Sequence, residues 1–155
     1  MFTMTTYGTW LRGDRRGWVD RGIIFPPNPE LEDHDRQRMK HPVFLFERDQ
    51  LLDVGSFIGK SLHERMNLRI LALTAQTWHV HFIAAATEHP ITAIVKCAKD
   101  AVRWGIRPGR PIWSDDYDKR FCFDEETLQK RIEYIEKHNI RIGFPAKPWE
   151  FIEKL

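Results

Sequence analysis

Cysteine is scarce in this chain. Two cysteines, Cys97 and Cys122, occur among 155 residues, and they do not form a Cys-x-x-Cys pair. A small secreted domain usually depends on several disulfides, and a cysteine-based zinc site needs closely spaced thiols. The sequence therefore argues against both and predicts reduced thiols in a cytosolic protein.

Long apolar runs are also missing. No stretch of eighteen apolar residues occurs, so we expect no membrane-spanning helix. The first residues, 1–6, lack the basic start and apolar centre of a signal peptide. Internal repeats and low-complexity segments are absent too. A chain of this length with 42% hydrophobic residues predicts a single globular domain over residues 1–155.

A strong net charge is absent as well. The formal charge of +2 excludes a molecule that attracts nucleic acid over its whole surface. Two local clusters remain, formed by Arg12, Arg15, Arg16 and Arg21 and by Arg103, Arg107 and Arg110. Such clusters can neutralise phosphates, and they are equally compatible with an ordinary solvated surface.

The periodicity of the apolar residues predicts the order of the elements. We expect a strand at 3–11, a helix at 47–66, a hairpin of strands 67–76 and 78–86, a helix at 91–105, a strand within 112–123, and a final helix that Asp124 caps. This order predicts an α+β fold: a ferredoxin-like split βαβ core with an antiparallel sheet and an extra C-terminal helix. Residues 12–46 are expected to form an irregular excursion with one short helix between Glu30 and Lys40.

The first chemical signal is His79-Val80-His81. Residues i and i+2 of a strand point to the same face of the sheet, so both imidazoles can reach one metal ion. The apolar residues on both sides of the pair favour a buried strand. Two satisfied structural histidines remain the alternative to a metal site.

The final helix carries the second signal. Tyr134 and His138 lie one turn apart, with Thr127 and Arg131 on the same flank. An ion held by two or three imidazoles keeps open positions and acts as a Lewis acid on a phosphoryl oxygen. It can also stabilise a phenolate for in-line attack on a phosphate. The alternative is that Tyr134 is a packing residue and that His138 interacts with the helix dipole.

A third signal is a basic stripe on the helix at 91–105. Lys96, Lys99 and Arg103 follow one another at helical spacing, and Trp78 and Trp104 supply aromatic rings. Such a stripe with aromatic rings suits single-stranded DNA, although a plain solvated face has the same pattern.

Several separate stretches carry a resemblance to a known family. They are Thr5-Thr6-Tyr7-Gly8-Thr9-Trp10-Leu11, Gly13-Asp14, Arg16-Gly17-Trp18-Val19, His79-Val80-His81, Lys96, Ile112-Trp113-Ser114 and Tyr134-Ile135-Glu136-Lys137-His138-Asn139. In this order they resemble the single-tyrosine HUH transposases, especially the REP-associated tyrosine transposases and their insertion-sequence relatives. The likeness extends over nearly the whole chain.

The resemblance implies a DNA nuclease and strand transferase that acts on single-stranded or hairpin DNA through a 5′-phosphotyrosine intermediate. It implies Mg²⁺ or Mn²⁺ bound by His79 and His81, Tyr134 as the nucleophile, and His138 or Asn139 as a further ligand. It also implies a homodimer in the bacterial cytoplasm, associated with the nucleoid.

Two departures from the family pattern stand out. Trp78 occupies a position that is usually Asn in the family, and His138-Asn139 replaces a frequent Asn-Pro. A site with three histidines shifts the metal preference toward Zn²⁺ or Mn²⁺ over Mg²⁺. The first hypothesis is a DNA nuclease and strand transferase. The two departures leave a second hypothesis, a domesticated, non-catalytic DNA-binding protein with the same fold. A third is a metal-binding or interaction fold without any nucleic-acid role.

Overall fold

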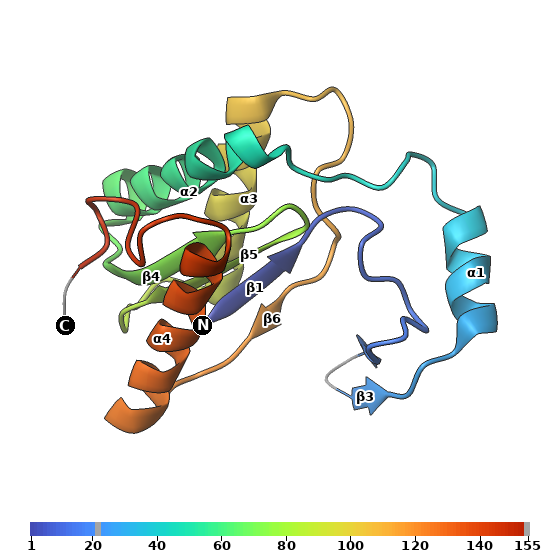
Figure 1. Ribbon diagram of the computed structural model, residues 1–155, viewed down its shortest axis with the longest axis horizontal. Coiled ribbons are helices and arrows are strands. Elements are labelled where there is room, and N and C mark those ends of the chain that lie inside the picture. Colours follow the sequence, from blue (N-terminus) through green and yellow to red (C-terminus); the bar gives the residue numbers. More distant parts are fainter. Residues whose placement is uncertain (21–22, 154–155) are drawn as a thin grey trace.

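The computed structural model describes residues 1–20 and 23–153 (Figure 1). Arg21, which belongs to the predicted early arginine cluster, lies outside the described residues. The elements are β1 (Phe2–Thr5), β2 (Trp18–Asp20), β3 (Ile23–Phe25), α1 (Pro29–Gln37), the 3₁₀ turn η1 (Arg48–Gln50), α2 (Leu51–Met66), β4 (Ile70–Ala75), β5 (His79–Ala84), α3 (Ile91–Ile106), β6 (Asp118–Lys119) and α4 (Glu125–Arg141).

The main sheet has the strand order β4-β5-β1-β6, and every neighbouring pair is antiparallel. The chain runs from β1 through α2 to β4, and β5 lies between β1 and β4 in the sheet. The connection from β5 through α3 to β6 encloses β1 in the same way. Two interlocked split βαβ units of this kind define the ferredoxin-like arrangement. The predicted α+β fold and the extra C-terminal helix are confirmed.

The two faces of this sheet are covered by different helices, as Figure 1 shows. On one face, α2 and α3 pack over a large apolar core that includes Val80 and Phe82 of β5. On the other face, Ile132 and Ile135 of α4 pack against Leu71, Ala72 and Ile83. Because side chains alternate along a strand, residues 79, 81 and 83 of β5 face α4. The layer between the sheet and α4 therefore contains the histidine pair.

The hairpin of β4 and β5 is confirmed, with Thr74 opposite His81 and Leu73 opposite Phe82. Every residue of β4 is buried, as expected when helices cover both faces of a strand. The interior position predicted for the histidine strand is also confirmed, because β5 lies between β4 and β1.

The predicted end of the first strand is wrong. The first strand ends at Thr5 and does not reach Leu11, because the chain turns at Gly8, whose φ is +77°. A side chain at that φ is strained, so Gly8 suits a turn and not a continuing strand. The last strand lies within the predicted 112–123 and consists of Asp118 and Lys119.

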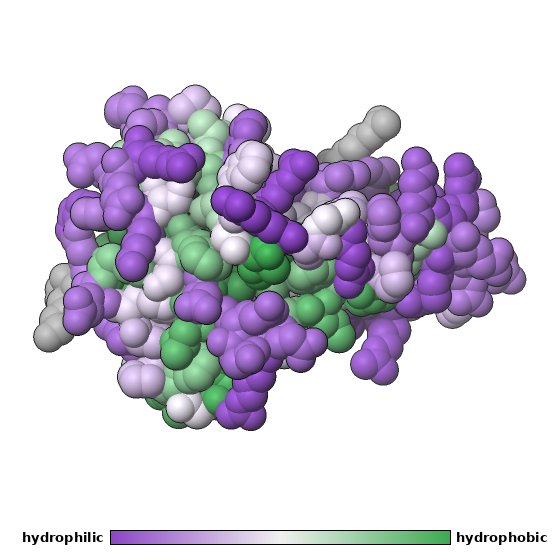
Figure 2. All heavy atoms as spheres, turned by 90° about the horizontal axis from the view of Figure 1, so that it is seen from above, coloured by the Kyte–Doolittle hydropathy of each residue, from purple (hydrophilic) through white to green (hydrophobic). Residues whose placement is uncertain are grey.

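The excursion at 12–46 is more ordered than the sequence predicts. It contains the predicted short helix, α1, which begins where the Asn28 side chain accepts a hydrogen bond from the Leu31 amide. It also contains the small β2–β3 sheet, which we did not expect. Three-residue strands are too short for an alternating pattern to stand out. Figure 2 shows that the end of the molecule formed by this excursion presents mainly hydrophilic side chains on the face seen there.

Among the described residues, no helix is both long enough and apolar enough to cross a membrane.

The C-terminal segment packs on α2 at two glycines. A Cβ on Gly55 would lie 2.0 Å from the Trp149 ring, and one on Gly59 would lie 2.0 Å from the Phe151 ring. Trp149 is buried, and its indole N–H donates to the Leu52 carbonyl at 2.9 Å. The absence of Cβ atoms therefore lets this segment cover the helix.

We expect Gly55→Ala to destabilise the protein although alanine is the better helix former. The higher helix propensity of alanine raises the free energy of unfolding by about 1 kcal/mol. Overpacking against the buried Trp149 ring lowers it by about 1–3 kcal/mol. Thermal unfolding should show a lower Tm, with Lys60→Ala on the exposed side of α2 as the control that leaves it nearly unchanged. A higher Tm for Gly55→Ala would contradict this contact.

Candidate metal and tyrosine centre

His79 and His81 project from β5 into the layer beneath α4. Their ring centroids are 4.5 Å apart, and the side chains are 5% and 8% exposed. β1 and β4 flank β5, so His81 lies between Thr3 on one side and Thr74 on the other. The predicted common face of the pair is therefore confirmed, and the face is nearly closed to solvent.

Helix α4 brings His138 and Tyr134 to the same place. The His138 ring lies 5.7 Å from His79 and 5.6 Å from His81, measured between centroids. The Tyr134 ring lies 4.6 Å from His138 and 5.7 Å from His81. Tyr134 is 46% exposed, so a ligand from solvent can reach its ring. The tyrosine and the three histidines thus form one cluster within a single chain.

Burial keeps these imidazoles neutral. It lowers the pKa of His79 to about 3, with further lowering by His81, His138 and Arg16. It lowers the pKa of His81 to about 4, together with the charge of His138. The pKa of His138 is lowered as well, first by burial and then by Arg141. Neutral imidazole is the form that binds a metal ion.

Hydrogen bonding leaves several ring nitrogens available. His81 Nδ1 lies 2.9 Å from the Thr3 hydroxyl, and this contact orients the ring and leaves Nε2 for another partner. His79 Nδ1 and His138 Nε2 are buried, and neither has a hydrogen-bond partner among the described residues. Buried polar atoms are normally paired, so an unpaired nitrogen on each of two facing rings indicates a place for a polar ligand.

The spacing of the three rings suits a divalent ion. Three imidazoles about 2.1 Å from one ion have centroids about 4.6–5.3 Å apart, for octahedral to tetrahedral angles. The observed separations of 4.5, 5.6 and 5.7 Å are close to this range. As the side chains stand, no group of three or more His, Cys, Asp or Glu residues in the described part of the chain is arranged to hold a metal ion. The donors and their spacing fit, and binding requires the rings to reorient.

Asn139, the alternative third ligand, points elsewhere. Its side-chain amide donates to the carbonyls of Leu73 and Ala146, each at 2.9 Å. The residue is completely buried, and its Oδ1 has no hydrogen-bond partner among the described residues. Asn139 thereby joins α4 to β4 and to the C-terminal segment. The structure brings His138, and not Asn139, to the histidine pair.

The predicted basic stripe lies on α3, on the face of the sheet opposite the histidines. Lys96 forms an ion pair with Asp100, and Arg103 is exposed. The Lys99 ammonium donates to the carbonyls of Ser114, Asp115 and Asp116 at 2.6–3.3 Å, and its burial lowers its pKa. These contacts hold the chain that leads to β6, so Lys99 does not form a free stripe with the other two.

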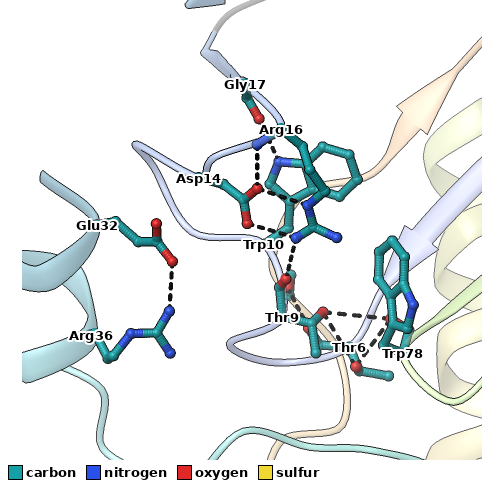
Figure 3. A network of polar contacts seen from close by, with 10 residues as sticks. Thr6, Thr9, Trp10, Asp14, Arg16, Gly17, Glu32, Arg36 and Trp78 are labelled. Carbon is teal, nitrogen blue, oxygen red and sulfur yellow. Dashed lines mark hydrogen bonds and ion pairs between the residues drawn. The ribbon is translucent and has the colours of Figure 1, made fainter. Parts of the chain in front are cut away.

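Trp78 lies directly beside the centre, and the sequence prediction missed its partners. Its ring is 4.0 Å from the His79 ring, and the Arg16 guanidinium lies 4.8 Å from the Trp78 ring and 4.1 Å from the Trp10 ring. Figure 3 shows the Arg16 guanidinium beside both tryptophans. The sequence signals for these partners were the early arginine cluster, which includes Arg16, and the stretches that carry the family resemblance, which include both Trp10 and Arg16.

Comparisons with protein-family models, with curated proteins and with solved structures found no match to this chain.

The lowered histidine pKa values predict acid sensitivity without metal. The pKa values of His79 and His81 are about 3 and about 4 in the folded protein, against about 6.5 in the unfolded chain. Below pH 6.5 the unfolded chain takes up protons that the folded protein does not, so stability falls as the pH drops. Each histidine contributes a loss of about 1–2 kcal/mol between pH 7 and pH 5.

Denaturant unfolding in EDTA at a series of pH values measures this loss. The variant His79→Gln should show a shallower decline than the unmodified protein, because glutamine does not titrate. Equal declines in the two proteins would show that His79 is not held neutral by the fold.

Proposed function

We propose that this protein cleaves and rejoins single-stranded or hairpin DNA through a covalent 5′-phosphotyrosine on Tyr134, in the manner of a tyrosine transposase. One observation carries the proposal: an exposed tyrosine shares one cluster with two buried imidazoles and one half-buried imidazole. The Tyr134 ring centroid lies 4.6 Å from that of His138 and 5.7 Å from that of His81. An exposed nucleophile beside metal-type ligands suits attack on a bulky phosphodiester.

Tyr134 performs the covalent step. Its hydroxyl oxygen forms a bond to the phosphorus, and the bond from phosphorus to the 3′ oxygen breaks. The phenol proton leaves to solvent, and the released 3′ oxygen takes up a proton to become a hydroxyl. Reversal of the same step by another 3′ hydroxyl rejoins the strand. No external energy source is needed, because one phosphodiester bond replaces another.

His79, His81 and His138 would hold the divalent ion, Mg²⁺ or Mn²⁺, with Mn²⁺ or Zn²⁺ favoured by three nitrogen ligands. When bound, the ion supplies charge stabilisation at the phosphoryl oxygens. The contact of Thr3 with His81 Nδ1 keeps that ring oriented. Burial keeps the rings unprotonated at neutral pH, so they are ready to bind a cation.

The DNA contacts of this proposal lie on both faces of the sheet. Trp78 borders the centre and contacts the strand near the scissile phosphate, whereas Lys96 and Arg103 lie on the opposite face of the sheet and contact a more distant part of the DNA. The protein acts as a homodimer at the bacterial nucleoid. Its chemistry does not require a tyrosine from the second subunit, since Tyr134 lies beside His81 of its own chain.

A denaturing gel tests the proposal. The protein is incubated with fluorescent single-stranded and hairpin oligonucleotides in Mn²⁺, and a band that survives denaturation and moves with the protein is expected. The band should be missing in EDTA. Salt-sensitive binding without any such band would contradict the proposal.

That second outcome would support a non-catalytic DNA-binding protein. The observation that favours this alternative is the contact of Arg16 with two tryptophans. Its guanidinium lies 4.1 Å from the Trp10 ring centroid and 4.8 Å from the Trp78 ring centroid, and none of the three residues takes part in bond cleavage. It predicts DNA binding that does not depend on a metal ion.

A further inference from the structure

A second functional element adjoins the histidine cluster. Trp10, Arg16 and Trp78 form a ladder in which the guanidinium contacts both indole rings, whose centroids are 5.9 Å apart. The last step of the ladder, from Trp78 to His79, leads to the candidate centre. We name Trp10, Arg16 and Trp78 the indole ladder.

The contacts of Arg16 fix the ladder in place (Figure 3). Asp14, which is 6% exposed, accepts two hydrogen bonds from the Arg16 guanidinium at 2.6 and 2.7 Å. The Thr9 carbonyl accepts a third at 2.7 Å. The ion pair lowers the pKa of the Asp14 carboxyl and keeps it charged. These hydrogen bonds therefore hold Arg16 against the two indoles.

The Trp10 ring and the Trp78 backbone are anchored as well. The Trp10 indole N–H donates to the Gly17 carbonyl at 2.8 Å, and the Trp78 carbonyl accepts from the Thr6 hydroxyl at 3.1 Å. Trp10 nevertheless stays 38% exposed. An indole used only for packing would gain more from full burial. A rigid and partly exposed indole instead offers a flat face that loses little entropy when a ligand stacks on it.

We propose that the indole ladder is a stacking platform for an unpaired nucleobase next to the phosphate at the histidine cluster. Arg16 is already neutralised by Asp14, so stacking contributes more here than charge. In a duplex the base faces are covered by neighbouring bases, and only an unpaired base can stack on an indole. The platform therefore selects single strands over duplexes. This inference rests on the proposed function for the location of the phosphate, but binding tests it without cleavage.

The test uses the full chain with Tyr134→Phe, so that no covalent product forms. Fluorescence anisotropy measures its affinity for labelled oligodeoxythymidine and for an abasic strand of equal length. Adding Trp10→Ala should weaken binding to oligodeoxythymidine roughly tenfold, within the range of stacking contributions, and leave the abasic strand nearly unchanged. Trp10→Phe should restore most of the affinity. Phe123→Ala removes a 91% exposed aromatic ring from the segment before α4 and is the control; it should have no effect.

A latch that only holds the loop in place would behave differently. In that case Trp10→Ala would weaken the binding of both oligonucleotides equally, or of neither, and either result overturns the platform. A lack of binding to oligodeoxythymidine overturns it as well. Because Trp10→Ala could disturb the loop, a second measurement uses Tyr134→Phe with no further change and an oligonucleotide bearing 5-iodouracil. Photocrosslinks should fall on Trp10 or Trp78, and crosslinks confined to other residues would contradict the platform.

The two proposals fail separately. If the unmodified protein gives a covalent band and Trp10→Ala has no base-dependent effect, the cleavage proposal stands and the platform proposal fails. If Trp10→Ala has the base-dependent effect and no covalent band forms, the platform proposal stands and the cleavage proposal fails.

Discussion

Replacing Tyr134 by phenylalanine will abolish the covalent DNA adduct while DNA binding stays within about twofold. Phenylalanine keeps the ring that contacts His138 and His81, and it removes only the oxygen that bonds to phosphorus. Loss of a covalent nucleophile lowers the rate by at least about a thousandfold. Quantified denaturing gels give the adduct yield, and anisotropy gives the affinity.

Tyr117→Phe is the matched control for this result. Tyr117 lies just before β6 and packs against the main core, so its hydroxyl should be dispensable and the adduct yield unchanged. An adduct that persists in Tyr134→Phe and disappears in Tyr117→Phe would move the nucleophile to the other tyrosine. Persistence in both variants would eliminate tyrosine chemistry at these two positions.

Removing one histidine of the pair should eliminate metal binding without unfolding the protein. Leucine at position 79 approximates the volume of histidine, and His79 Nδ1 has no hydrogen-bond partner among the described residues that the substitution would strand. We expect stability in EDTA to change by less than about 1 kcal/mol. Cleavage in Mn²⁺ should fall at least about a thousandfold, because the phosphoryl charge is no longer stabilised.

Calorimetric titration with Mn²⁺ and thermal unfolding in EDTA measure the two effects. His63→Leu, on the exposed side of α2, is the control and should retain both binding and cleavage. A His79→Leu protein that still binds Mn²⁺ with the original affinity would exclude His79 as a ligand. One that unfolds would instead identify the pair as structural histidines.

Local patterns explain why most elements could be predicted from the sequence. The apolar spacing of α2 and α3 and the Asp124 cap of α4 depend on neighbouring residues alone. The β2–β3 sheet could not be predicted, because each strand has three residues. The end of β1 was missed because Gly8 turns the chain inside a segment rich in residues that favour strands.

Part of the candidate centre could likewise be predicted from local patterns, and part could not. The spacing of His79 and His81 places both on one face of a strand, and the spacing of Tyr134 and His138 places both on one side of a helix. Each pair follows from local geometry. Asn139 has nearly the same sequence position as His138, and helical rotation alone turns its amide toward Leu73 and Ala146.

The sequence by itself determined the order of the helices and strands of the core, the α+β class, and the pairs His79/His81 and Tyr134/His138. The tertiary structure alone decided that α4 covers the face of β5 that bears His79 and His81, within the same chain. It also decided that the loop at 9–17 places Arg16 against both Trp10 and Trp78, and that α3 carries Lys96 on the far face. The physical reason is that periodicity records which face of an element is buried, whereas the packing of the whole chain selects the distant element that covers it.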